Sequence, residues 1–307
     1  MRRGRFIGCT LVAALVLSPM LLVPGASAQD KHGMRVVSEQ TATGFAFPES
    51  VAYDPQAKVL YVGQFGSELK PTQKDGKGKI SKVSLSGTVL EDQFLPPQDA
   101  ILHKPKGIWV MGNRLWVTDI DVVWIFDLTT RKGRKVELPG IQFANDPTLL
   151  GNALYVSDNR GDQLYRVEPA DFLHLQGEPQ VTRVFAGKSI HPNGLYPAQD
   201  GSLLIVGFKS QDEARGIYTL SSDGEPKALS KPLGRLDGVY QMQDGTVLVT
   251  DWNAGALATW SATREMEPLA SGFKGPADFC VVPNAEGFMV VVPDLVKREL
   301  RMVQLAQ

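Results

Sequence analysis

Residues 107–119 read GIWVMGNRLWVTD, two apolar strands joined by a tight Gly-Asn turn. The same arrangement returns as PTLLGNALYVSD at 147–158, GLYPAQDGSLLIVG at 194–207 and GVYQMQDGTVLVTD at 238–251. No segment of useful length has the period of an amphipathic helix. The pattern therefore predicts an all-β protein built from repeated hairpins.

Each hairpin follows a short phrase whose lead residue stands where the inner strand begins. The phrases are PESVAY, PKGIWV, ANDPTL, PNGLYP, LDGVYQ and PADFCV, with lead residues Glu49, Lys106, Asn145, Asn193, Asp237 and Ala277. These lead residues are 57, 39, 48, 44 and 40 positions apart, close to the roughly 40–50-residue repeat of a four-stranded propeller blade. Third and fourth strands follow, as in GKISKVSL at 78–85 and GTVLEDQFL at 87–95. The spacing predicts a six-bladed β-propeller of four-stranded blades.

The last phrase starts at Ala277, too near the end of the chain for a complete blade. Residues 34–39, MRVVSE, can supply the missing outer strand. Pairing between the N- and C-terminal strands would close the propeller and remove its exposed edges. We therefore expect residues 29–307 to form one domain, without an internal linker.

The first 28 residues have the pattern of a secretory signal peptide. Arg2, Arg3 and Arg5 precede an apolar stretch, and residues 26–28, Ala-Ser-Ala, form a small-residue cleavage signal. Residues 18–19, Ser-Pro, and 24–25, Pro-Gly, interrupt the apolar stretch and no comparable run follows, so no membrane span is expected after cleavage. The mature chain is expected to start near Gln29 and to be secreted or periplasmic.

Composition narrows the possible partners of the mature chain. The sequence holds 32 Lys and Arg against 33 Asp and Glu, and three of the arginines lie in the predicted leader. This acidic balance, without a basic helix or an aromatic and basic ladder, argues against nucleic acid. Cys9 leaves with the leader, so Cys280 remains as a core side chain and no internal disulfide is possible. We expect a monomer.

The direction of the strands predicts which loops surround the lead residues. The connection after the second strand of each blade returns to the end of the propeller where the lead residue lies, which we call the mouth. The expected rim consists of residues 64–78, 120–123, 159–163, 208–216, 252–256 and 295–298. The longest of these, 64–78, is expected to form a mobile flap whose Lys70, Lys74 and Lys77 are either simply solvated or steer anions toward the tunnel.

Four lead residues, Glu49, Asn145, Asn193 and Asp237, carry side-chain oxygen. Blades around one axis would bring these oxygens together, and hard oxygen donors suit Ca²⁺ better than zinc or copper. The two carboxylates would balance the charge of one Ca²⁺ in the central tunnel. Each residue alone also fits a turn former that bonds its own backbone, so the metal prediction depends on the set.

Other polar residues have simpler interpretations. Asp119, Asp158, Asp251 and Asp294 end the second strands, where an aspartate commonly caps the following turn. The four histidines show no metal spacing, although His191 is close enough to Asn193 to reach the mouth. Lys106, in a lead position, is expected either to hold a substrate carboxylate or phosphate or to be exposed.

The quartet Glu49 in FPESVAY, Asn145 in FANDP, Asn193 in HPNGLY and Asp237 in LDGVY resembles that of the gluconolactonase, senescence marker protein (regucalcin) and luciferin-regenerating enzyme family. The resemblance spans nearly the whole mature chain. It implies a six-bladed propeller with Ca²⁺ in the tunnel, Asp237 as metal ligand and general base or nucleophile, and Asn145 as a ligand of metal or substrate. Sugar-lactonase members have an arginine where this chain has Phe143, which argues against a polyhydroxy sugar lactone.

These observations predict an exported, calcium-dependent hydrolase of the lactonase or esterase type. The metal would polarise a carbonyl or phosphoryl oxygen while Asp237 activates water or attacks. The expected substrate is a hydrophobic or carboxylated lactone or ester, with Phe65, Phe208 and Trp252 either as an apolar wall or as packing between the blades. The alternative is a non-catalytic NHL-like propeller that binds a protein or small ligand through its mouth. Lys106 and Phe143 favour this alternative.

Overall fold

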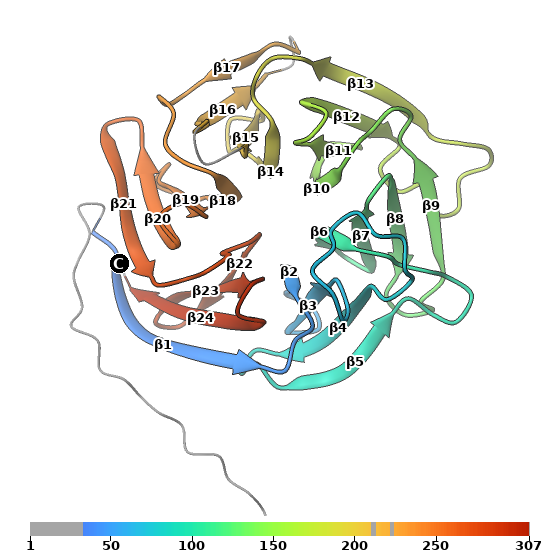
Figure 1. The fold of residues 1–307 in the computed structure, drawn as a ribbon, viewed down its shortest axis with the longest axis horizontal. Coiled ribbons are helices and arrows are strands. Elements are labelled where there is room, and N and C mark those ends of the chain that lie inside the picture. Colours follow the sequence, from blue (N-terminus) through green and yellow to red (C-terminus); the bar gives the residue numbers. More distant parts are fainter. Residues whose placement is uncertain (1–32, 210–212, 222–223, 307) are drawn as a thin grey trace, which may run out of the picture.

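The computed structural model describes residues 33–209, 213–221 and 224–306. The predicted leader lies outside these residues. The described residues form six four-stranded antiparallel sheets arranged around one axis, as Figure 1 shows, which confirms the predicted six-bladed propeller. No helix in this part of the chain is long and apolar enough to cross a membrane.

The first three blades follow the predicted order, from the axis outward. They consist of β2 (Pro48–Asp54), β3 (Val59–Gln64), β4 (Lys79–Ser84) and β5 (Val89–Leu95); then β6 (Pro105–Met111), β7 (Arg114–Asp119), β8 (Val122–Asp127) and β9 (Gly133–Glu137); then β10 (Ala144–Leu150), β11 (Ala153–Asp158), β12 (Gln163–Glu168) and β13 (Gln180–Ala186).

The next two blades repeat the arrangement, and the last one closes the ring. They consist of β14 (Pro192–Pro197), β15 (Leu203–Gly207), β16 (Ile217–Leu220) and β17 (Pro226–Ala228); then β18 (Leu236–Gln241), β19 (Val247–Asp251), β20 (Ala256–Ser261) and β21 (Arg264–Ser271); then β22 (Cys280–Asn284), β23 (Gly287–Asp294), β24 (Glu299–Ala306) and β1 (Arg35–Thr43). The N-terminal strand β1 pairs antiparallel with β24, which confirms the predicted closure.

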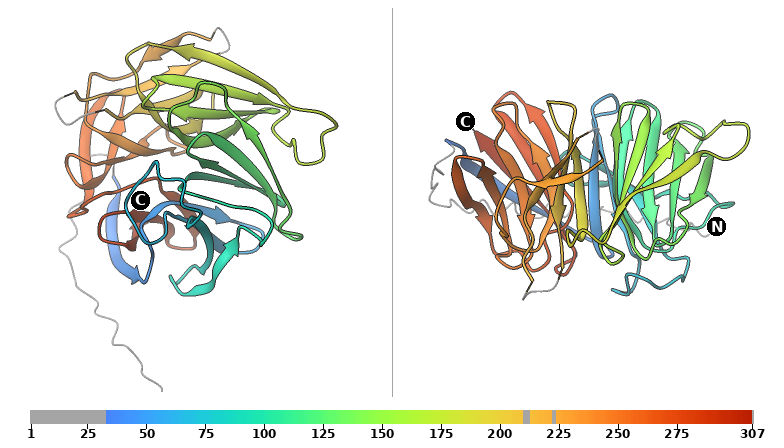
Figure 2. Two further views of the ribbon diagram at one scale, coloured as in Figure 1. Left: turned by 45° about the vertical axis from the view of Figure 1, so that its right-hand side comes forward. Right: turned by 90° about the horizontal axis from the view of Figure 1, so that it is seen from above.

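The blades are held together by apolar side chains between neighbouring sheets. Tyr61 and Ile80 of the first blade pack with Ile108 and Val117 of the second. Figure 2 shows the resulting disc, in which the strands run roughly along its short axis. Cys280, predicted as a core side chain, is a half-buried free thiol against the cluster between the sixth and first blades.

Tight turns between the first and second strands of each blade have the predicted chemistry. Gly112 and Gly151 lie in these turns with φ values of 58° and 61°. Positive φ is accessible to glycine without a steric penalty, which explains its recurrence there. These turns lie at the end of the propeller opposite the lead residues.

Candidate active site at the mouth of the propeller

The inner strands are irregular at the lead residues. The strand register shifts between Pro48 and Ser50, and between Ala144 and Pro147. Similar shifts occur at the lead residues of β6, β14 and β18. A bulge changes the direction of a side chain and is common beside active sites. In this propeller the bulges turn lead residues away from the regular alternation of the strand.

Hydroxyl groups tie the backbone of the lead residues to the preceding blade. Ser157 Oγ donates to the Asn193 carbonyl oxygen at 2.6 Å, and Thr250 Oγ1 donates to that of Ala277 at 3.0 Å. Thr118 Oγ1 makes the equivalent bond to Asn145. These bonds are buried, where a lost partner is costly, so the lead residues stand on a rigid support.

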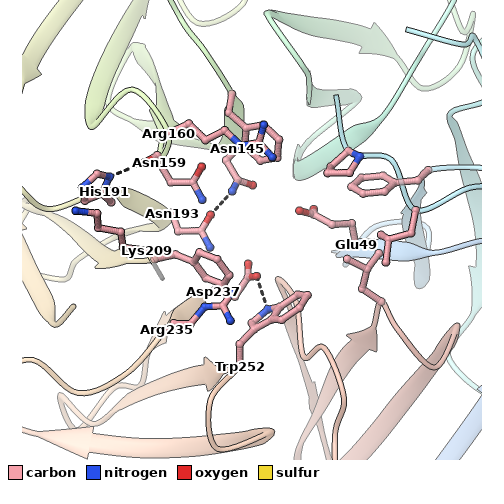
Figure 3. A pocket seen from close by; sticks show the side chains of 16 residues that line it. Glu49, Asn145, Asn159, Arg160, His191, Asn193, Lys209, Arg235, Asp237 and Trp252 are labelled. Atoms are coloured by element: carbon pink, nitrogen blue, oxygen red, sulfur yellow. Dashed lines mark hydrogen bonds between the residues drawn. The ribbon is translucent and has the colours of Figure 1, made fainter. Parts of the chain in front are cut away.

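The four oxygen-bearing lead residues line one cavity at the mouth. Glu49, Asn145, Asn193 and Asp237 all contribute to its surface, and its volume is about 550 Å³. Figure 3 shows the two asparagines and Asp237 in a row, with Glu49 facing them. The structure therefore brings together four residues that span much of the sequence.

The loops expected at the rim form most of the cavity wall. Phe65, Leu69 and Pro71 come from residues 64–78, Asn159 and Arg160 from 159–163, Phe208 and Lys209 from 208–216, Trp252 from 252–256, and Leu295 from 295–298. Phe143 also lines the cavity. Residues 120–123 do not contribute to this wall. The expected apolar side of Phe65, Phe208 and Trp252 is thus present, together with Phe143.

A buried lysine holds loop 64–78 in place through hydrogen bonds. Lys104 is fully buried and donates to the Phe65 carbonyl oxygen and to Asp75, both at 2.8 Å. Lys74 pairs with Asp121 at 2.6 Å and Lys70 with Glu68 at 2.5 Å. Of the three lysines expected to steer anions, these two are therefore already paired with acids.

Lys106 occupies a different environment from the other lead residues. It is fully buried and does not line the cavity. Its Nζ lies 4.1 Å from the centre of the Phe143 ring and 3.4 Å from the Lys104 carbonyl oxygen. Burial lowers the pKa of Lys106 to about 8, and the nearby carboxylate of Glu49 opposes that shift. Phe143 therefore lies between a buried ammonium and the cavity.

His191 and the aspartates at the ends of the second strands make hydrogen bonds to nearby backbone groups. His191 lines the cavity, and its Nδ1 lies 2.7 Å from the Asn159 carbonyl oxygen. Asp294 accepts backbone N–H bonds from Lys274, Gly275 and Lys297. The aspartates at 119, 158 and 251 also accept backbone N–H bonds. The predicted capping of the following turn is confirmed for Asp158, Asp251 and Asp294, whereas Asp119 accepts instead from His103 and Lys104, before the inner strand.

Asp237 is oriented by Trp252 and Arg235. The Trp252 indole donates to Oδ2 of Asp237 at 2.7 Å. Burial raises the pKa of Asp237 to about 7, while the bond from Trp252, the charge of Arg235 and a bond from Asn193 oppose the rise. Desolvation and the charge of Asp237 raise the pKa of Glu49 well above its usual value, and Lys106 opposes this.

Two further carboxyl groups lie near this pair, Asp146 and Asp278, each directly after a lead residue. Desolvation and the charge of Asp278 raise the pKa of Asp146 well above its usual value. For half-buried Asp278, desolvation and the charge of Asp237 have the same effect. Asp146 Oδ2 also accepts the backbone N–H of Leu195 at 2.6 Å. Neither residue was identified from the sequence.

A sequence signal for these two carboxyl groups does exist. Glycine follows the lead residue in three other blades, at 107, 194 and 238. A Cβ atom on Gly107 would lie 2.4 Å from Asp146 Oδ1, and one on Gly238 would lie 2.9 Å from Asp278 Oδ1. Both contacts are too short, so glycine in one blade makes room for aspartate in the next.

The mouth has the donor chemistry for a hard cation. Glu49 Oε2 is buried and has no hydrogen-bond partner, which is costly for a carboxyl oxygen unless a ligand satisfies it. Among the described residues no three His, Cys, Asp or Glu side chains are grouped for a metal. A Ca²⁺ ion would therefore also need the amide oxygens of Asn145 and Asn193. The Asn145 amide currently donates to the Asn193 side-chain oxygen.

Solved structures with the same fold include enzymes of two kinds. A gluconolactonase from Xanthomonas campestris has a TM-score of 0.65 and 15% identity, with 94% of this chain and 98% of that chain covered. A virginiamycin B lyase from Staphylococcus aureus has a TM-score of 0.60 and 16% identity, with 88% and 99% covered. A streptogramin B lyase has a TM-score of 0.59 and 14% identity, with 87% and 97% covered.

These similarities establish the architecture. The predicted resemblance to gluconolactonase-type propellers is confirmed at the level of the fold. No protein-family model and no curated protein matches this sequence. Because the same fold serves unrelated reactions, the activity has to be inferred from the residues of the cavity.

Proposed function

We propose that this protein is a calcium-dependent hydrolase of lactones or esters, with its reaction centre in the mouth cavity. The observation that carries the proposal is the convergence of Glu49, Asn145, Asn193 and Asp237 on one cavity. The gluconolactonase with the same fold supports the reaction class.

Asp237 is the proposed general base or nucleophile. Without a bound cation the Asp237 carboxyl has a pKa of about 7 and is partly ionised at neutral pH, and a bound calcium ion would lower this pKa and hold the group as a carboxylate. The bonds from Trp252 and Asn193 hold the Asp237 carboxylate in a fixed orientation at the cavity surface. Phe208 and Trp252 line the same cavity as Asp237, so they would keep its carboxylate in a partly dry environment.

Glu49, Asn145, Asn193 and Asp237 would hold the calcium ion. When bound, this ion would polarise a carbonyl or phosphoryl oxygen of the substrate and neutralise the two carboxylates. Release of the Asn193 oxygen from the Asn145 amide would accompany binding. The buried, unpartnered Oε2 of Glu49 supports this set.

The direct experiment is a hydrolysis assay on lactones, carboxylic esters and organophosphate esters, with calcium or with a chelator. Asp237→Asn removes the base with little change in volume, and Asp244→Asn, in an exposed turn, serves as the matched control. Activity that disappears with chelator and in Asp237→Asn supports the proposal. Activity that survives both changes would overturn it.

The alternative is a non-catalytic propeller that binds its ligand at the mouth. The hydrogen bond between the Asn145 and Asn193 side chains favours it, because it closes part of the proposed metal site. Absence of hydrolysis of every ester and lactone, with or without calcium, would support this alternative.

We also propose that the mature protein acts outside the cytoplasm. The proposal depends on the Arg-rich, apolar and Ala-Ser-Ala pattern of residues 1–28. The intact mass of the exported protein tests it, since a chain that begins near Gln29 should lack the whole apolar segment.

A further inference from the structure

We propose that the cavity selects a substrate with a carboxylate, and that Arg235 holds this carboxylate while Arg160 supports it from the rim. For its reaction this inference depends on the proposed hydrolase function, but the binding of the carboxylate can be measured separately. It assigns to two arginines the anion recognition that the sequence suggested for Lys106.

Arg235 lies on the segment directly before β18, two residues before Asp237. Its side chain lines the cavity, and its guanidinium lies 4.4 Å from the Phe208 ring centre and 5.7 Å from that of Trp252. The two rings meet edge to face, with centroids 5.7 Å apart. Such contacts orient the planar guanidinium while leaving its N–H groups available to an anion.

The guanidinium of Arg235 makes no salt bridge with a described acid, although its charge acts on Asp237 and Asp251. Its Nε is buried without a hydrogen bond. Several other arginines of the described chain are paired with acids, as Arg114 is with Asp127 at 2.7 Å and Arg131 with Glu91 at 2.6 Å. Because a desolvated charge is costly when unpaired, a ligand carboxylate is the partner that the cavity lacks.

Arg160 provides a second cation at the opening. It belongs to the turn between β11 and β12 and lies 4.2 Å from the centre of the Phe143 ring. In Figure 3 it lies near the Asn145 end of the row formed by Asn145, Asn193 and Asp237, and Arg235 lies near the Asp237 end. No described acid forms a salt bridge with Arg160, so its charge is available at the rim.

The remaining cations near the cavity are less suited to this role. Lys209 is already paired with Glu213 at 2.5 Å. Lys106 is buried against Phe143 and does not line the cavity. A bound cation would neutralise the acids at the mouth. The cavity would then be positively charged, because Arg160 and Arg235 remain uncompensated. A monoanionic substrate with an apolar body therefore fits both the charge and the aromatic wall.

The simplest rival explanation is that Arg235 only tunes Asp237. Its charge does oppose the rise in the pKa of Asp237. Loss of that tuning would lower activity toward anionic and neutral substrates equally and would shift the pH profile. Loss of a carboxylate contact would lower activity toward the anionic substrate alone. The two roles are therefore separated by a matched pair of substrates.

The experiment compares a monoaryl ester of glutaric acid with the same ester whose free carboxyl is converted to a carboxamide. We expect wild-type protein to prefer the carboxylate, and Arg235→Gln to lose about 10- to 100-fold of that preference in kcat/KM, as for a charge-assisted hydrogen bond. Arg160→Gln should lose less of the preference for the carboxylate ester. Arg235→Lys should retain part of the preference, because it keeps the charge but not the planar fork.

Arg298→Gln is the matched control. Arg298 also lies over an aromatic ring, 4.0 Å from the centre of Phe47, on a loop at the mouth, but it does not line the cavity. Its replacement should leave the preference unchanged. Equal losses toward both esters in Arg235→Gln, with a shifted pH profile, would overturn the inference, as would a preference for the carboxamide in wild type.

Calorimetry with glutarate and its uncharged diamide, on calcium-saturated protein, separates this inference from the proposed function. Glutarate binding that is lost in Arg235→Gln but kept in Arg298→Gln, without hydrolysis of any ester, would overturn the hydrolase proposal and support carboxylate binding. Calcium-dependent hydrolysis without preference for either ester would support the hydrolase proposal and overturn carboxylate binding. Arg235→Lys supplies the comparison if Arg235→Gln does not fold.

Discussion

The indole Nε1 of Trp252 donates a 2.7 Å hydrogen bond to Oδ2 of Asp237. The same indole meets the Phe208 ring at 88°. The aromatic wall and the proposed base therefore form one unit, in which a change to the wall also changes the ionisation of the carboxyl group.

Trp252→Phe should raise the pKa of Asp237 above its value of about 7, because the lost bond stabilises the ionised carboxylate. Calcium must then displace a proton from more molecules at neutral pH, so kcat/KM at subsaturating calcium should fall by about tenfold at pH 7. The acidic limb of the pH profile should move to higher pH. Trp124→Phe is the control, since its indole Nε1 is buried without a hydrogen-bond partner. An unshifted profile in Trp252→Phe would contradict the proposed role.

The carboxyl groups at the mouth should make stability depend on both pH and calcium. Burial raises the pKa of Asp237 from 3.8 to about 7, so the folded protein holds this proton more tightly than the unfolded chain does. The corresponding stability is complete below about pH 4 and is lost as pH rises through about 7. Glu49, Asp146 and Asp278 act in the same direction.

We therefore expect calcium to raise the melting temperature more at pH 8 than at pH 5. At pH 8 the ion relieves repulsion between ionised groups, whereas at pH 5 it must displace protons. Thermal melts with calcium and with chelator measure the difference, and Glu49→Gln should abolish most of it. Glu265→Gln, which removes an exposed charge, is the control. Equal gains at both pH values would exclude these carboxyl groups as the calcium site.

The recurring lead residues made the fold and four cavity residues predictable from the sequence. Strand alternation and turn chemistry are local, and a spacing near that of a propeller blade places equivalent positions around one axis. The same reasoning could not place Lys106. Its backbone is in register with Asn145 and Asp237, but Phe143 packs over its ammonium, and such a contact between blades depends on tertiary packing.

Asp146 and Asp278 were missed for a related reason. Regular alternation would direct residues after the lead positions away from the axis, but a bulge disturbs alternation at Asn145. Arg160 and Arg235 were missed because they lie on connecting segments, whose side-chain directions are not determined by a repeat. The complementary pattern of Gly107 with Asp146 and Gly238 with Asp278 was the available signal.

The second-strand aspartates should contribute to stability and not to calcium binding. Asp294 accepts backbone N–H bonds from Lys274 at 2.8 Å, Gly275 at 3.1 Å and Lys297 at 3.0 Å. Asp294→Asn replaces an acceptor-only group with one that has a single acceptor oxygen, and should cost about 1–3 kcal/mol in the free energy of unfolding. Urea unfolding measures this cost. A weaker affinity for calcium in a variant of unchanged stability would show that this aspartate had been assigned incorrectly.

Lys106→Met should strengthen calcium binding without changing the preference for a carboxylate. The buried ammonium lowers the pKa of Glu49, so it is close enough to oppose a second cation at that carboxylate. Removal of a like charge in a partly desolvated site should tighten calcium binding by roughly tenfold. Methionine keeps most of the volume beneath Phe143, so folding should be preserved.

Calcium affinity measured by calorimetry, together with the two glutarate esters, tests the role of Lys106. Lys135→Met is the control, because Lys135 is exposed over Trp124, at 5.8 Å from the ring centre. The expected result is tighter calcium binding and an unchanged ratio of kcat/KM for the two esters. A lost preference for the carboxylate, with calcium affinity unchanged, would instead make Lys106 the anion-binding residue and would require Phe143 to move aside when substrate binds.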